Sequence, residues 1–139
     1  MNTRTFALIW GIGFLLAGAA GFIPGITDMS AAPHPDLKMT HGFGHELGMW
    51  PVNTLHNVAH LAFGLWGILA YRSYAGARTY ARGVAIVYGL FIVMGLIDGL
   101  NTTFGLVPLY GGDVWLHALL ALPAAYFGWM HRDRVDDRA

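Results

Sequence analysis

Cysteine is absent from this chain of 139 residues, and charged residues are scarce. Without cysteine the protein has no disulfides, thiolate metal ligands or thiol nucleophiles. Only 12% of its residues are charged and 55% are hydrophobic, whereas a soluble domain usually carries about twice that charge. The sequence also lacks a phosphate-binding glycine loop, a nucleophile elbow and an HExxH zinc motif. Any chemistry must therefore use imidazole, carboxylate, amide or hydroxyl groups, and enzymatic activity stays undecided.

Four long segments carry almost no charge, and each approaches the length of a membrane-crossing helix. About 20 apolar residues span the hydrocarbon core of a bilayer as a helix. We therefore predict an all-α integral membrane four-helix bundle that forms a single domain over residues 1–139. The predicted spans are residues 5–26, 51–71, 83–101 and 114–131, and residues 27–50 form an outer loop.

All basic residues except Lys38, which lies in the outer loop, are on one side of these predicted spans. The arginines occur before the first span, between the second and third, and after the fourth: Arg4, Arg72, Arg78, Arg82, Arg132, Arg134 and Arg138. The positive-inside rule then predicts that both termini are cytoplasmic, in a bacterial inner membrane. Met1–Arg4 and Ala17-Gly18-Ala19 resemble parts of a signal peptide, but we expect the first span to be retained.

Short matching segments indicate either two related halves or a coincidence of composition. Gly21-Phe-Ile-Pro24 resembles Gly105-Leu-Val-Pro108, and Leu55-His56 resembles Leu116-His117. A duplication would give a tandem parallel repeat of two helical hairpins about an axis along the membrane normal. The expected partners are the lipid bilayer and either a second copy or a larger membrane complex. Nothing in the charge balance favours nucleic acid.

Polar residues gather near the outer ends of three predicted spans. Such groups are costly in hydrocarbon, so their convergence predicts a functional site. His56 and His60 are four residues apart and share one helix face, and His117 enters the fourth span at a similar depth. The supporting polar residues and a carboxylate at the end of the third span are Asn53, Asn57, Asn101, Asp113 and Asp98.

This polar layer has several interpretations. His56, His60 and His117, with Asp98 as ligand or orienting partner, would suit a divalent transition metal such as zinc, copper or iron. A scaffold is the alternative, in which hydrogen bonds merely hold the helices in register within an accessory subunit. A third interpretation is haem or another tetrapyrrole held by His60 and His117, and a fourth is an ion path. His41 and His45 in the outer loop either reach the layer from above or lie in water.

Three segments resemble a family of small four-span bacterial membrane proteins with no established function. They are the stretch Pro51 to Gly67, with Asn-x-x-His-Asn-x-x-His, the connection Ala77 to Arg82, and the stretch Gly105 to His117. The resemblance implies that Asn53, His56, His60, Asp113 and His117 form a shared site. Tyr110 stands where the family pattern has a small polar residue, and the loop with His34, His41 and His45 is peculiar to this chain.

Overall fold

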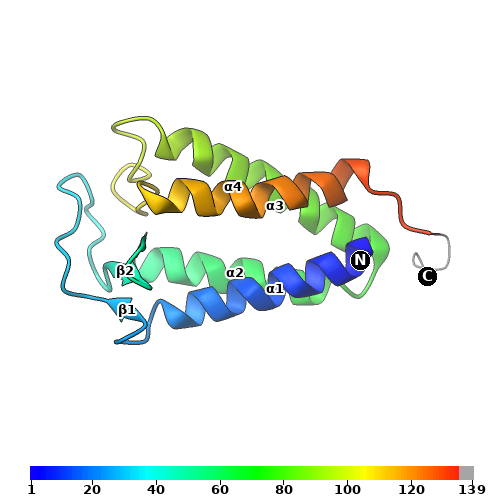
Figure 1. The fold of residues 1–139 in the computed structure, drawn as a ribbon, viewed down its shortest axis with the longest axis horizontal. Coiled ribbons are helices and arrows are strands. Elements are labelled where there is room, and N and C mark those ends of the chain that lie inside the picture. Colours follow the sequence, from blue (N-terminus) through cyan, green and yellow to red (C-terminus); the bar gives the residue numbers. More distant parts are fainter. Residues whose placement is uncertain (135–139) are drawn as a thin grey trace.

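The computed structural model describes residues 1–134, which form four helices and a small sheet (Figure 1). The elements are α1 (Thr3–Ala20), β1 (Thr27–Asp28), β2 (Gly44–Glu46), β3 (Trp50–Val52), α2 (Thr54–Ala70), α3 (Tyr74–Gly95), α4 (Gly112–Ala125) and a π-helical turn η1 (Tyr126–Met130). The prediction of a mainly helical chain with four helices is confirmed, and a small three-stranded sheet that was not predicted accompanies them. Arg138 lies outside the described residues.

The helices pack as two hairpins. The closest backbone packing joins α1 to α2 and α3 to α4, whereas α1 and α4 approach each other much less closely. Aromatic side chains fill the centre between the hairpins, including Phe6, Phe14, Tyr80 and Tyr88. The start of α1 and the end of the described chain lie at one end of the bundle, which we name the termini end, and the sheet lies at the other, the cap end (Figure 1).

The cap sheet occupies the predicted outer loop. Its three antiparallel strands follow the order β1-β2-β3, and Glu46 of β2 is paired with Thr27 of β1 and Trp50 of β3. The strands have only two or three residues, too few to show the alternation of apolar and polar residues by which a strand is recognised in a sequence. The cap therefore could not be distinguished from an irregular loop.

The third helix begins earlier than predicted. Ser73 is its N-cap and accepts a hydrogen bond from the backbone N–H of Gly76. Arg78 and Arg82, expected in a connecting loop, thus lie within α3, and the Nε–H of each donates to the carbonyl of Gly128 at 3.0 and 2.9 Å. Long arginine side chains allow a helix to continue through a charged region, since the charged end reaches beyond the apolar surface.

Two of the four helices, α1 and α3, are long and apolar enough to cross a membrane by themselves. Helix α2 has 17 residues, and α4 has 14 before it continues into η1. Pro123 lies inside α4 and has no N–H to donate, which favours a change of helical hydrogen bonding in this region.

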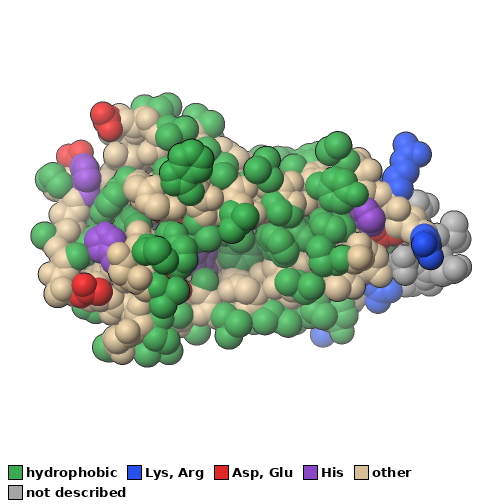
Figure 2. Space-filling view, in the orientation of Figure 1, with side chains coloured by type: hydrophobic (Ala, Val, Ile, Leu, Met, Phe, Trp, Pro, Cys, Tyr) green, Lys and Arg blue, Asp and Glu red, His purple; other side chains and the backbone are tan. Residues whose placement is uncertain are grey.

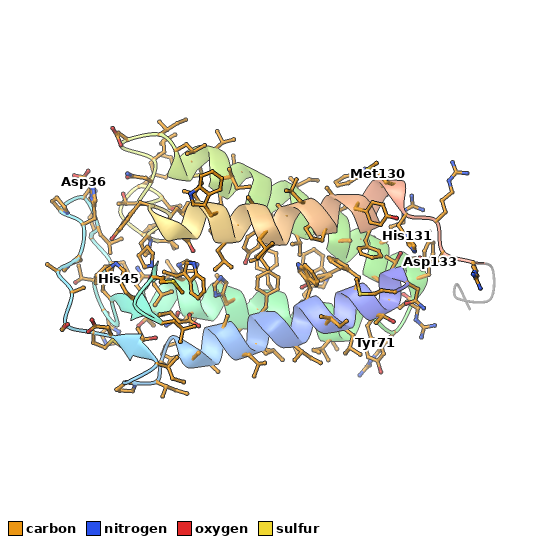
Figure 3. The ribbon with its side chains drawn as sticks, in the orientation of Figure 1. Asp36, His45, Tyr71, Met130, His131 and Asp133 are labelled. Carbon is orange, nitrogen blue, oxygen red and sulfur yellow. The ribbon has the colours of Figure 1, made fainter. Side chains whose placement is uncertain are left out.

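At the termini end, the two ends of the described chain are joined. The Asp133 carboxylate accepts hydrogen bonds from the backbone N–H and the Oγ1–H of Thr3, and His131 Nε2 lies 2.9 Å from it. Figure 3 shows Asp133 and His131 beside the start of α1. Phe6 of α1 stacks on Phe127 of η1 with ring centroids 4.7 Å apart. The start of α1 is therefore packed tightly against the end of the last helix.

Candidate metal site

Asn53 fixes the start of α2 and hence the position of its histidines. Its Oδ1 accepts a hydrogen bond from the backbone N–H of His56, as expected of a helix N-cap. Its Nδ2 donates to the carbonyls of Met39 and Leu106, both at 2.8 Å. Asn53 thus joins the helix to the cap and to the connection between α3 and α4, so the structure gives it a positioning role.

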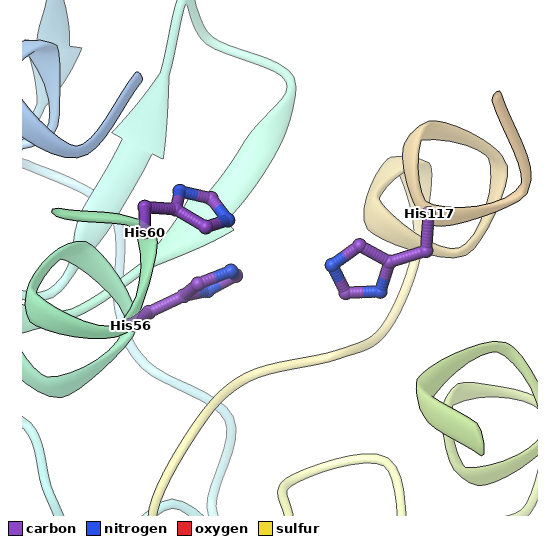
Figure 4. A group of neighbouring side chains, drawn as sticks. All are labelled: His56, His60 and His117. Atoms are coloured by element: carbon purple, nitrogen blue, oxygen red, sulfur yellow. The ribbon is translucent and has the colours of Figure 1, made fainter. Parts of the chain in front are cut away.

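Three histidines meet between α2 and α4. One ligand atom from each of His56, His60 and His117 lies within 4.8 Å of the others, and all three side chains are buried. The ring centroids of His56 and His60 are 4.5 Å apart, and those of His56 and His117 are 6.1 Å apart. Figure 4 shows the two rings of α2 directed toward the ring of α4. Their spacing along α2 and the facing position on α4 create this arrangement.

Five of the six imidazole nitrogens of this group lack hydrogen-bond partners among residues 1–134. This holds for Nδ1 of all three histidines and for Nε2 of His60 and His117. Burying a polar group without a hydrogen bond costs about 1 to 3 kcal/mol. The cluster is therefore costly as a purely structural element, and neutral imidazoles with free lone pairs are common metal ligands.

Aromatic rings pack against two of the three histidines. The Tyr88 ring meets His117 edge-on at 4.8 Å between centroids, and Phe14 of α1 lies 5.7 Å from His60. These contacts restrict the rotamers of the imidazoles and exclude water from their apolar faces. A tetrahedral ion with ligands at about 2.1 Å separates neighbouring nitrogens by roughly 3.4 Å. The ligand atoms lie within 4.8 Å of one another, so pairs at this limit would approach by about 1.4 Å on binding an ion.

Asp113 is the carboxylate nearest to the cluster. It lies one turn before His117 on α4, its Oδ2 is 3.4 Å from His117 Nε2, and both side chains are buried. The sequence analysis assigned this position to Asp98, but Asp98 follows the end of α3, is exposed and does not join the group. The physical reason is that α3 ends at Gly95, so Asp98 lies in a turn rather than on the inward face of a helix.

Glu46 is a second buried acid above the cluster, and the sequence analysis did not single it out. Its position in β2 places it close enough to interact electrostatically with Asp113. Burial raises the pKa of the Glu46 carboxyl above its usual value. Only the cap sheet turns this side chain inward, and strands as short as these leave no recognisable pattern in a sequence.

The other polar candidates are dispersed around the cluster. Asn57 is fully buried and faces the end of α1, where a Cβ added at Gly21 would overlap its amide. Asn101 is buried in the connection that follows α3, and its backbone carbonyl accepts a hydrogen bond from the backbone N–H of Leu109. In the cap, His41 Nδ1 lies 2.9 Å from Thr54 Oγ1. His45 meets Phe43 edge-on, and neither cap histidine joins the group.

Comparisons with known proteins place the chain in a family without assigning chemistry to it. The model of the family described as "Domain of unknown function (DUF4383)" matches residues 4–130. No curated protein and no solved structure matches the chain. The matched segment contains all four helices, the cap and the three clustered histidines.

Proposed function

The chain belongs to the DUF4383 family of unknown function, and we propose that it is an integral membrane protein that binds a divalent transition metal ion through His56, His60 and His117. The observation that carries the proposal is the convergence of three buried imidazoles, five of whose six nitrogens have no hydrogen-bond partner among the described residues. Imidazole ligands suit zinc, copper and iron, and thiolate ligands are excluded because the chain has no cysteine.

The charge of the neighbouring carboxylate supports a cation in this position. Three neutral imidazoles leave the charge of a divalent ion uncompensated, and burial of uncompensated charge is costly. Asp113, next to His117, would supply one negative charge in the same buried region once an ion is bound. Carboxylates that accept a hydrogen bond from a metal-bound histidine commonly orient its ring and increase its basicity.

Placement of the bundle in a membrane is supported by its outer surface. Large apolar side chains are exposed on all four helices, including Ile12 and Leu16 of α1, Leu65 and Leu69 of α2, Ile86 and Leu90 of α3, and Leu119 and Leu122 of α4. A surface of this kind is unusual for a soluble monomer but suits contact with lipid. At 1.5 Å per residue, α1 and α3 extend about 27 and 33 Å, close to the thickness of the hydrocarbon core.

We propose that α2 and the α4–η1 segment cross beside them, which gives four crossings. The 17 residues of α2 extend about 25 Å, and local thinning of a bilayer accommodates so small a mismatch. Basic side chains gather at the termini end (Figure 2), which favours a cytoplasmic location for that end. The histidines then lie in the outer half, and the two hairpins would be the units of the tandem repeat.

The geometry favours a metal ion over haem. A haem held between His60 and His117 would extend several ångströms from its iron on every side. His56 lies 4.5 Å from His60 between ring centroids and 6.1 Å from His117, in the space that the macrocycle needs. The scaffold interpretation expects hydrogen bonds among these polar groups, and the described residues provide none for the nitrogens of His60.

Metal content and affinity test the proposal directly. The protein is purified in detergent, its bound metal is measured by mass spectrometry, and Co²⁺ is added to detect the visible absorption of a coordinated ion. We expect a stoichiometric ion in the wild type. Loss of a residue that hydrogen-bonds to a metal ligand typically weakens metal binding roughly 10- to 100-fold. Because His117→Ala removes a proposed ligand itself, we expect it to weaken binding by at least this factor.

The matched control is His34→Ala in the cap, because His34 lies outside the group. It should retain the wild-type metal content and the Co²⁺ spectrum. If the wild type binds no added zinc, copper, iron or cobalt, or if His117→Ala binds these ions as tightly as the wild type, the metal-binding function is wrong and the scaffold interpretation remains.

A further inference from the structure

A hollow between α1 and α4 leads from the outer surface of the bundle to His60. Its volume is about 470 Å³, within the size range of small-molecule sites. It is lined by one face of α1, including Ile9 and Gly13, and by α4 from Leu116 to Pro123. Figure 2 shows the hollowed region on this face of the molecule, with apolar side chains around it. We name this hollow the α1–α4 groove.

The α1–α4 groove opens onto the apolar outer surface rather than onto the cap. Ile9 and Leu119, which line it, are 48% and 67% exposed and belong to the surface that faces lipid in the proposed membrane placement. None of the described residues that line it is Asp, Glu, Lys or Arg. A molecule that reaches this groove therefore comes from the hydrocarbon phase, and the lining favours an uncharged chain.

His60 is the one strongly polar group at the base of this groove. Its side chain is 4% exposed, and both ring nitrogens lack a partner among residues 1–134. Neither ring nitrogen is exposed at the groove in this structure, so contact with a bound molecule requires the ring to turn about its Cβ–Cγ bond. A neutral imidazole carries a proton on one nitrogen, so His60 always has an N–H that needs an acceptor. If one nitrogen binds metal, the other carries this proton.

We propose that the α1–α4 groove binds a lipid-soluble molecule with an alkyl chain and a carbonyl headgroup, whose oxygen accepts the hydrogen bond from His60 after the imidazole has turned toward the groove. The chain lies along the apolar walls, and the carbonyl satisfies the buried donor. A neutral acceptor fits better than a carboxylate or phosphate because no basic side chain lines the groove to compensate a negative charge. The inference rests on the proposed membrane placement but not on the bound metal.

Photolabelling in lipid nanodiscs tests the inference. The probe is a long-chain 2-alkanone with a photoreactive diazirine in its chain, and the comparison probe is the same chain without the carbonyl oxygen. We expect the ketone to label peptides from Ile9 to Ala17 and from Leu116 to Pro123 at least fivefold more than the exposed face of α3. We expect the alkane to show no such preference.

Two glycines provide a matched pair of variants. A Cβ added at Gly13, in the groove, or at Gly89, on α3, meets no atom within 4 Å. Gly13→Leu should fill the groove and abolish preferential labelling, whereas Gly89→Leu should leave it unchanged. His60→Phe keeps a ring against Phe14 but removes the donor, so it should reduce ketone labelling to the level of the alkane.

The possible results separate this inference from the metal site. Uniform labelling of all exposed helices, or equal labelling by ketone and alkane in the groove, would mean that only ordinary lipid chains occupy it and would overturn the inference. Preferential ketone labelling that Gly13→Leu does not reduce would place the ligand elsewhere and overturn it as well. Metal content is measured on the same samples, so metal-free protein that retains selective labelling contradicts the metal proposal alone.

Discussion

At the scale of single residues, Glu46 carries an electrostatic cost in the folded protein. It is 8% exposed and lies in the cap near Asp113, so two acids share a region with little water. Burial raises the pKa of Glu46 above its value in the unfolded chain. The folded state therefore binds the proton of Glu46 more tightly than the unfolded state, and ionisation of this group opposes folding.

Replacement of Glu46 by glutamine should change the pH dependence of stability. The favourable contribution of protonated Glu46 is fully present below its unfolded pKa and is lost as pH rises through the higher folded pKa. Glutamine has the same shape and does not ionise. We therefore expect Glu46→Gln to gain stability relative to the wild type between pH 4.5 and pH 7 in thermal melts. A constant difference in melting temperature across this range would show that Glu46 does not titrate in this way.

The triad of histidines could be anticipated from sequence, but its carboxylate could not. The spacing of His56 and His60 places both on one helix face, and the position of His117 in the last helix brings it to a similar depth. Asp98 and Asp113 both lay near the expected layer. The choice between them depended on where α3 ends, and helix ends are less well determined by sequence than helix existence.

At the scale of elements, glycines set the distance between α1 and α2. A Cβ added at Gly67 would lie 2.7 Å from the Cα of Gly11 and 2.9 Å from the carbonyl oxygen of Ala7. Both atoms belong to the backbone of α1, so relief requires the helices to separate. Close approach through small residues is a common basis of helix association in membranes.

Gly67→Ala should consequently destabilise the bundle, by about 1 to 3 kcal/mol as for other overpacked interfaces. The measurement is thermal or denaturant unfolding in detergent, followed by circular dichroism. Gly89→Ala is the control because its Cβ has open space, and the higher helix propensity of alanine should leave it as stable as the wild type or slightly more stable. Equal stability of the two variants would contradict the proposed role of Gly67.

The helices were more predictable than the cap for a physical reason. A long apolar run gives a signal over many residues, so four helices could be expected from the sequence. The pairing of Gly44 with Val52 and of Thr27 with Glu46 depends on contacts between separate segments. The arginines also did not mark a loop before α3. The side chains of Arg78 and Arg82 donate hydrogen bonds to the carbonyl of Gly128, about 50 residues later in the sequence, so both residues can lie within the helix.

At the scale of the whole molecule, the proposed four crossings predict which ends face which compartment. The natural chain has no cysteine, so a single introduced cysteine reports on one position without background. Ala32 in the cap and Ala75 near the start of α3 are both exposed and lie at opposite ends of the bundle. We expect a membrane-impermeant maleimide to label Ala32→Cys on intact spheroplasts, and to label Ala75→Cys only after lysis.

Labelling of both positions on intact spheroplasts, or of Ala75→Cys alone, would contradict the proposed orientation. Recovery of the protein in the soluble fraction after lysis would contradict membrane placement itself. The wild-type chain is the blank in each measurement because it offers no thiol.

The junction between α1 and the last helix is held unequally along its length. Thr3 and Asp133 tie it at one end, Phe6 stacks on Phe127, and Trp10 Nε1–H donates to the carbonyl of Leu120 at 3.3 Å. The α1–α4 groove lies beside this last contact and extends from it toward the cap, as far as Ala17 on α1. Any widening of the groove must therefore occur by rotation of α1 relative to the last helix about the tied end. Small angular movements then produce displacements that grow toward the cap end and leave the termini end closed.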